Sequence, residues 1–282
     1  MSDRLEVKKT YKLYIGGAFP RSESGRSYEV HSADGTFVAN PCLASRKDLR
    51  DAVVAARTAQ NGWAGATAFN RGQILYRIAE MMEGRAEQFA TEISLLDGVS
   101  SAEAMKEVHA AIDLWVWYAG WSDKLSVIAG STNPVSGPYY NFTIPEPMGV
   151  VGVLATEEQS LLGLVNAIAP IIVSGNSTVV LASSRAPLPA ITFAEVLATS
   201  DLPHGVCNIL TGKKSELAPW FASHMEINAL DISGVLDPAD VADIKVAGAQ
   251  NLKRIHSFGE SATPQRILAF MESKTIWHPI GI

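Results

Sequence analysis

Two cysteines carry the most nucleophilic side chains of this chain, and neither stands in a pattern typical of a reactive site. Cys42 and Cys207 have no second cysteine and no histidine at metal-ligand spacing. Cys207 lies in an apolar run, where a thiol behaves as a small buried hydrophobic group. The six histidines are scattered and form no Ser/His/Asp pattern. The sequence therefore predicts no metal site, and it predicts structural or exposed positions for the histidines.

A glycine pair, Gly149-x-x-Gly152, opens a segment in which short apolar runs alternate with helical patterns. The pair alone is a weak indication of a nucleotide site. The order around it says more, because short apolar runs separated by helices are what a parallel sheet covered on both faces requires. The predicted fold is therefore α/β, with a Rossmann-like doubly wound parallel sheet. Its expected strands are 149–155, 177–181, 206–210, 227–232 and 254–256, with helices at 161–173 and 189–198.

The N-terminal third is predicted to be mainly helical. Alternating apolar residues within 11–40 suggest paired strands. Ser45 is a plausible N-cap with Asp48 three residues on, and apolar residues then recur at helical spacing up to Trp63. Further helical patterns begin near residue 70 and cover 86–96 and 104–118.

Residues 125–147 change in composition to Ser, Pro, Gly, Tyr and Thr, which predicts a protruding hairpin. Its β-forming residues are Tyr139, Tyr140, Phe142 and Ile144.

Length and charge exclude several classes of protein. A chain of 282 residues with 47% hydrophobic composition can bury a sizeable core. The net charge of -6, without a Lys/Arg cluster in the sequence, argues against nucleic acid as a partner. The longest apolar stretch, 161–173, is too short to span a bilayer, and residues 1–10 contain no apolar export segment. We expect no membrane association and a cytoplasmic location, which the small number of cysteines also favours.

Four runs resemble the aldehyde dehydrogenase superfamily in their order and spacing. They read Glu146-Pro-Met-Gly-Val-Val-Gly-Val, Ile168-Ala-Pro with Ser174-Gly-Asn-Ser-Thr-Val-Val-Leu181, Leu202-Pro-His-Gly-Val-Cys-Asn-Ile-Leu-Thr-Gly212 and Asn251-Leu-Lys-Arg254. The resemblance extends from Tyr11 to about Gly259. A shorter C-terminal run, Ser273-Lys-Thr-Ile-Trp277, is similar to the last strand of the family's oligomerisation region.

The resemblance implies that one domain of the family is missing. Only Glu260 to Arg266 bridge the two matches, and these seven residues reach about 25 Å when fully extended. The family has its catalytic domain at this place, with the cysteine that attacks the aldehyde. The implied division is an NAD-binding-like domain, 1–124 and 148–262, and an oligomerisation β-flap, 125–147 and 267–282. We therefore expect a truncated, catalytically degenerate member without catalytic residues.

Positions that match the family's working residues have changed chemistry. An Asn that donates to the oxyanion corresponds to Glu158, and an ionised carboxylate repels an oxyanion. Glu158 is expected instead to cap the helix that begins near Ser160. The Lys and Glu that hold the cofactor ribose correspond to Ala182 and Arg185. This replacement would cost about 1.5–3 kcal/mol of cofactor binding free energy for each strong hydrogen bond lost.

Two further positions differ on the far side of the expected sheet. The helix that faces the pyrophosphate in the family follows a Gly-Ser pair, whereas Val235 here has no hydroxyl and Asp237 adds negative charge. Phe258 stands at the position of the family's general base and cannot accept a proton. No cofactor is expected to bind, and NAD(P) only if binding persists in an altered mode.

The retained features point to assembly. In the family, the hairpin and the last strand cross a subunit boundary. We hypothesise a non-catalytic subunit, a pseudoenzyme, that forms homo-oligomers or docks onto a full-length aldehyde dehydrogenase. A vestigial nucleotide-binding protein and an NAD(P)-dependent aldehyde oxidoreductase that acts only with a partner remain alternatives. The expected oligomerisation residues are Tyr139, Tyr140, Phe142, Ile144, Lys274, Thr275, Ile276 and Trp277.

Overall fold

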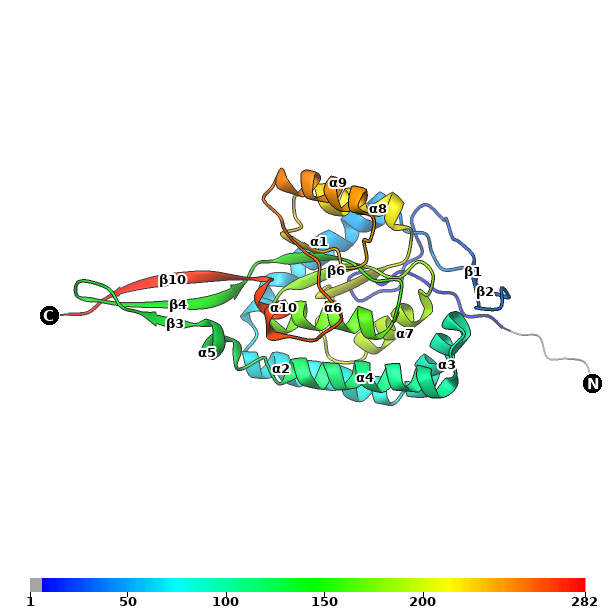
Figure 1. Ribbon diagram of the computed structural model, residues 1–282, viewed down its shortest axis with the longest axis horizontal. Helices are drawn as coiled ribbons and strands as arrows, with labels where there is room; N and C mark the ends of the chain where they lie inside the picture. Colours follow the sequence, from blue (N-terminus) through cyan, green and yellow to red (C-terminus); the bar gives the residue numbers. More distant parts are fainter. Residues whose placement is uncertain (1–6, 282) are drawn as a thin grey trace, which may run out of the picture.

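A five-stranded parallel sheet forms the centre of the computed structural model, which describes residues 7–281 (Figure 1). Residues 1–6, part of the segment expected to hold no export signal, and residue 282, the end of the expected β-flap, lie outside the described range. The strand order is β7-β6-β5-β8-β9. The strands are β5 (Val150–Leu154), β6 (Ser177–Leu181), β7 (Cys207–Leu210), β8 (Ala229–Asp231) and β9 (Arg254–His256).

Helices cover both faces of this sheet. One face carries α1 (Arg46–Gly65), α8 (Lys214–Ser223) and α9 (Pro238–Ala249), and the other carries α6 (Leu162–Val173) and α7 (Leu188–Leu197) (Figure 1). Successive strand residues therefore enter different cores: Val151 and Val153 pack with α6, while Val150 and Leu154 pack with α1. Every residue of β5 is buried, which explains its uninterrupted apolar pattern. The predicted α/β fold class is confirmed.

Three long helices form an outer layer against α6 and α7: α2 (Ala68–Glu83), α3 (Ala86–Asp97) and α4 (Ser101–Ala119). Trp115 of α4 is fully buried and stacks on Phe193 of α7, with ring centroids 5.7 Å apart. The predicted capping box at the start of α1 is present, because Ser45 and Asp48 each accept a backbone N–H of the other. The sequence located these helices to within a few residues.

Residues 11–40 contain the expected paired strands, but the pairings are short. β1 (Val30–His31) and β2 (Phe37–Ala39) form an antiparallel pair, and a tight turn pairs Ile15 with Ala18 through two backbone hydrogen bonds of 3.0 Å. Tyr14 lies against β7 instead, with its amide donating to the carbonyl of Ile209 at 2.9 Å and the return bond at 2.8 Å. The apolar alternation in this segment therefore reflects packing on the edge of the main sheet.

A separate three-stranded antiparallel ribbon projects from the body (Figure 1). It consists of β3 (Ser131–Asn133), β4 (Tyr139–Pro147) and β10 (Met271–Pro279), in the order β10-β4-β3. The prediction of β structure over 125–147 missed a short helix, α5 (Leu125–Ala129), at its start. The link from β9 to β10 is not extended either, because it contains α10 (Pro264–Leu268), which packs on α6.

Candidate functional site

The carboxyl ends of β5 and β8 enclose the best-placed cavity for a ligand, which we call the crevice. The chain runs from β5 through α6 to β6 on one side, and β8 lies on the other side, so this is the topological switch point of the sheet. Open α/β sheets bind ligands at such points. The cavity volume is about 280 Å³. Its walls come from the last two residues of β5 and the loop 155–159, from α6, from Asp231 at the end of β8 and the loop that follows it, and from the link between β9 and β10.

The N-terminus of α6 faces this region but its first amides are already bound. The backbone N–H groups of Leu161 and Leu162 both donate to Glu107 Oε1 of α4, at 3.0 and 3.1 Å. Burial raises the pKa of Glu107 above its ordinary value, although both amides favour the charged carboxylate. The expectation that Glu158 caps this helix is wrong. Glu158 is exposed in the preceding loop, and the carboxylate that reaches the helix belongs to α4.

Glu157, which the sequence reasoning passed over, fills the space at the end of β6. Its carboxylate accepts hydrogen bonds from Ser183 Oγ at 2.6 Å and from the amide of Arg185 at 3.2 Å, and it pairs with the ammonium of Lys214. Although partial burial alone raises its pKa, the bonds from Lys214 and Ser183 hold the pKa of Glu157 below its ordinary value. No local pattern marks Glu157, because Lys214 lies far away in sequence.

Ala182 and Arg185 follow β6 in the same place. Ala182 is buried. Arg185 bonds Asp97 at the end of α3 at 2.7 Å, and it also donates to the backbone carbonyl of Glu157 at 2.9 Å. The guanidinium thus ties α3 to the loop after β5. The two residues that the resemblance led us to compare with the family's ribose contacts are thus a buried methyl group and a guanidinium engaged within the protein.

At the end of β8, a buried ion pair closes the crevice from the other side. Asp231 is 1% exposed and Arg266 of α10 is 4% exposed, with 3.7 Å between Oδ2 and Nη2. Burial raises the pKa of Asp231 and lowers that of Arg266. Arg266 also donates to the carbonyl of Gly259 at 2.9 Å, and its guanidinium lies 4.7 Å from the ring centroid of Phe258. Phe258 is therefore part of a packed wall.

The link between β9 and β10 is held against α6 by a second contact. Asn166 of α6 donates to the carbonyl of Glu260 at 2.6 Å, and Tyr118 of α4 donates to Asn166 at 3.2 Å. The link between β9 and β10 thus forms one side of the crevice.

Val235 and Asp237 also have structural roles. Val235 is partly buried against the core under α1 and α8. Asp237 is the N-cap of α9 and accepts from the amide of Ala239 at 2.8 Å. Glycine is required at position 234, just before Val235, since a Cβ there would lie 2.0 Å from the carbonyl oxygen of Ala155. The loop after β8 therefore packs directly on the end of β5.

Neither cysteine has the setting of a nucleophile. Cys207 is 1% exposed in β7, and burial raises the pKa of its thiol. Cys42 is also buried, and both thiols are free. Across residues 7–281 no group of His, Cys, Asp and Glu side chains is arranged to hold a metal ion. In the same range no helix is long and apolar enough to cross a bilayer.

Known proteins give the family of this chain. Residues 19–268 match the aldehyde dehydrogenase family. Cytosolic 10-formyltetrahydrofolate dehydrogenase of Xenopus tropicalis is 33% identical over 261 residues, covering 90% of this chain and 28% of that protein. Retinal dehydrogenase 2 of Homo sapiens is 34% identical over 256 residues, covering 89% of this chain and 48% of that protein.

Solved structures agree with this match. A putative aldehyde dehydrogenase from Burkholderia cenocepacia superposes with a TM-score of 0.83 at 26% identity, over 88% of this chain and 50% of that one. An NAD+ complex of aldehyde dehydrogenase from Bacillus cereus gives a TM-score of 0.81 at 26% identity, with the same coverage of both chains. This chain spans about half the length of these structures. It belongs to the aldehyde dehydrogenase family.

Proposed function

We propose that this chain is a non-catalytic member of its family, a pseudoenzyme whose role is assembly with copies of itself or with a full-length aldehyde dehydrogenase. The observation that carries the proposal is the projecting ribbon. Its strands β4 and β10 pair over nine residues each, from Met271 opposite Pro147 to Pro279 opposite Tyr139. The ribbon is therefore ordered although little of it packs on the body.

The outer edge of β10 is open among the described residues. β10 pairs with β4 on one side and lies at the end of the strand order. An open edge presents backbone N–H and C=O groups that another strand can bind. The contacts within the ribbon, such as Lys274 to Glu146 at 2.9 Å and Thr275 to Thr143 at 2.9 Å, fix its register. The edge is thus preformed for pairing.

Aromatic side chains gather at the tip of the ribbon. Trp277 is 58% exposed and Tyr139 is 42% exposed, and their rings meet edge to face at 5.8 Å. Tyr140 beside them is exposed as well. Large aromatic residues are enriched at protein interfaces, where their burial contributes much of the binding free energy. We assign the expected set, including Phe142, Ile144 and Ile276, to this interface.

The crevice supports the non-catalytic part of the proposal. Its volume of about 280 Å³ lies at the lower end of the range of small-molecule pockets, about 300–1,000 Å³, whereas a dinucleotide is a large ligand. Polar groups around it already have partners in the protein: Ser183 bonds Glu157, the amide of Leu161 bonds Glu107, and Asp231 pairs with Arg266. We therefore expect no cofactor, and we place the protein in the cytoplasm, where its two free thiols would stay reduced.

The test measures assembly directly. Light scattering coupled to size-exclusion chromatography is run on the chain alone and mixed with a full-length aldehyde dehydrogenase. The double variant Tyr139→Ala with Trp277→Ala should lose assembly, whereas Tyr76→Ala, which removes an exposed aromatic ring from α2, should keep it. A chain that stays monomeric at every concentration and ignores the full-length enzyme contradicts the proposal.

A vestigial nucleotide-binding protein is the second candidate, favoured by the position of the crevice at the switch point. Calorimetry with NAD, NADP and ATP separates the two candidates, since saturable heat at millimolar ligand would support the nucleotide-binding protein. An aldehyde oxidation assay with and without a partner tests the remaining alternative. NADH production by the isolated chain would show that it is an enzyme after all.

A further inference from the structure

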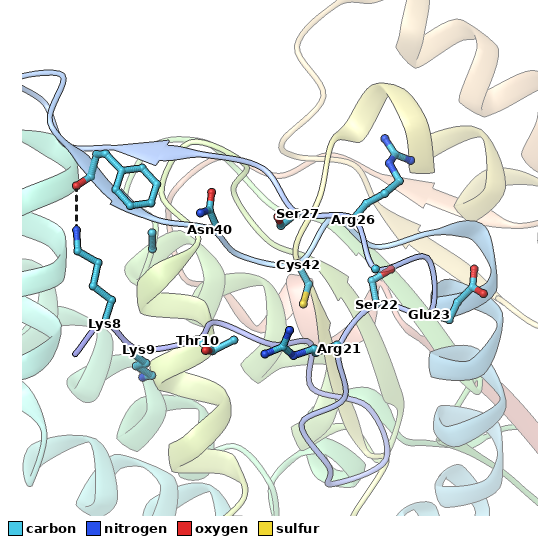
Figure 2. Close-up of a pocket in the computed structure, with 13 residues that line it drawn as sticks. Lys8, Lys9, Thr10, Arg21, Ser22, Glu23, Arg26, Ser27, Asn40 and Cys42 are labelled. Carbon is cyan, nitrogen blue, oxygen red and sulfur yellow. Dashed lines mark hydrogen bonds between the residues drawn. The ribbon is translucent and has the colours of Figure 1, made fainter. Parts of the chain in front are cut away.

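A second hollow, of about 500 Å³, lies beside the N-terminal segment (Figure 2). Three segments line it: 8–10, the loop 21–27, and 37–42, which includes β2. It shares no residue with the crevice. The volume is within the range of small-molecule pockets.

Positive charge gathers around this hollow. Lys8, Lys9, Arg21 and Arg26 line it, with Glu23 as the acid among the lining residues, which gives a formal charge of 4 − 1 = +3. The whole chain carries -6. All four cations come from residues 8–26, and the fold turns them toward one hollow, where the local field favours an anion.

Partners account for part of that charge. Lys9 pairs with Glu195 at 2.8 Å, and Arg26 forms two bonds with Glu216 at 3.0 and 3.2 Å. Glu23 is itself neutralised by Lys47 at 3.5 Å. The paired Glu23 carboxylate therefore repels an incoming anion only weakly.

The other two cations are not neutralised by the described residues. Lys8 lies 4.8 Å from the ring centroid of Phe37 and donates to the carbonyl of Phe37 at 3.5 Å, and neither group carries a negative charge. Arg21 forms no ion pair within 7–281, and its side chain extends beneath Cys42 toward Thr10 (Figure 2). Two of the four charges are therefore available to a ligand.

We propose that this hollow binds a small anion that bears phosphate groups. A guanidinium presents several N–H donors in a fixed plane that matches phosphate oxygens, and an ammonium adds a point charge. Neutral donors complete the wall: the hydroxyls of Thr10 and Ser27 and the amide of Asn40. Donors on several sides suit a tetrahedral oxyanion with many acceptor oxygens better than a single carboxylate. The proposal is independent of the assembly function.

Calorimetry on the full chain with inorganic pyrophosphate as the probe tests this. Saturable binding of one pyrophosphate per chain is expected at low ionic strength, weakening as salt is added. Arg21→Gln should weaken it about tenfold, equivalent to about 1.4 kcal/mol. Lys245→Gln, which removes an exposed cation from α9, is the matched control and should leave binding unchanged.

The outcomes separate the proposal from general charge attraction. No saturable heat at millimolar pyrophosphate overturns it. Equal weakening by Lys245→Gln and Arg21→Gln also overturns it, because binding would then follow net charge alone. Citrate that binds as tightly as pyrophosphate would contradict the assignment to phosphate. Unchanged thermal unfolding of Arg21→Gln would show that the variant is folded, so that its weaker binding reports the loss of the guanidinium.

Discussion

The crevice and the ribbon are built in opposite ways. In the crevice, charged groups find partners inside the protein: Glu107 binds the first amides of α6, Glu157 binds Lys214, and Asp231 faces Arg266. In the ribbon, β10 leaves one edge open and Trp277 is 58% exposed. The charged groups of one region are paired internally, although Asp231 Oδ2 and Arg266 Nε have no hydrogen-bond partner within residues 7–281. The other region presents unpaired backbone and apolar surface to the outside.

This difference indicates which process each region serves: the crevice contacts act on the stability of the monomer, and the ribbon surface acts on association. Breaking the internal pairs at the strand ends should destabilise the monomer, and a carboxylate or guanidinium held in such a pair is less available to a cofactor. Exposed aromatic rings and an open edge contribute little to the monomer, but they release free energy when another chain covers them. Variants in the two regions should therefore affect different measurements: crevice variants the free energy of unfolding, ribbon variants the association constant.

The largest effect is expected from Arg266→Ala. Removing this guanidinium leaves Asp231 buried without its charge partner, which typically costs about 3–5 kcal/mol. Urea unfolding should show the loss as a lower midpoint. Arg50→Ala is the control, because the Arg50 side chain is 59% exposed in its pair with Asp51 and such pairs contribute about 0–1 kcal/mol. Equal unfolding midpoints for the two variants would mean that the crevice wall does not stabilise the fold.

Trp277→Ala should separate the two regions most clearly. We expect association to weaken by about 2 kcal/mol, near a thirtyfold change in the dissociation constant, as for an aromatic interface residue. The unfolding free energy, measured at a concentration where the protein is monomeric, should hardly change. Sedimentation velocity gives the first quantity and urea unfolding the second. If the variant unfolds more easily but associates normally, the ribbon belongs to the monomer's core energetics and the comparison fails.

Neighbouring glutamates allow a smaller and closely matched test. Glu157→Gln removes the charge that Lys214 and Ser183 recognise, and we expect a loss of about 1 kcal/mol because the site is partly exposed. Glu158→Gln changes the next residue, which is exposed, and should be nearly neutral. Thermal unfolding of the pair compares them. A loss of the same size in both variants would remove Glu157 from its assigned role.

The sequence predicted the sheet well because each strand is buried on both faces. Runs such as Ser177–Leu181 are continuous in the sequence for the same reason that they are central in the sheet. The capping box of Ser45 and Asp48 was also readable, since its members are three residues apart.

The contacts inside the crevice could not be predicted from local sequence patterns. Glu107 lies 54 residues from the amide of Leu161 that it binds, and Glu157 lies 57 residues from Lys214. Such contacts depend on how α4 and α8 are placed by the rest of the fold, and no local pattern encodes them. The helix α10 was missed because its five residues are too few for a periodic signal.

The smallest effect is a difference in pH dependence between two glutamates of the crevice region. The folded-state pKa of Glu157 is lowered, so its contribution is present above the ordinary value of 4.5 and is lost as pH falls through and below it. The folded-state pKa of Glu107 is raised by burial, so ionisation penalises the fold as pH rises above 4.5. Glutamine cannot ionise but keeps an acceptor for the amides of α6.

The two Gln variants should therefore respond to pH in opposite directions. With rising pH, Glu157→Gln becomes more destabilising relative to the wild type, whereas Glu107→Gln becomes less destabilising. Urea unfolding of both variants across the acidic range measures these slopes, with Glu158→Gln as the baseline for an exposed carboxylate. Slopes of the same sign would show that burial and internal bonding do not act separately on these two carboxylates. The claim that separate internal partners close the crevice would then be wrong.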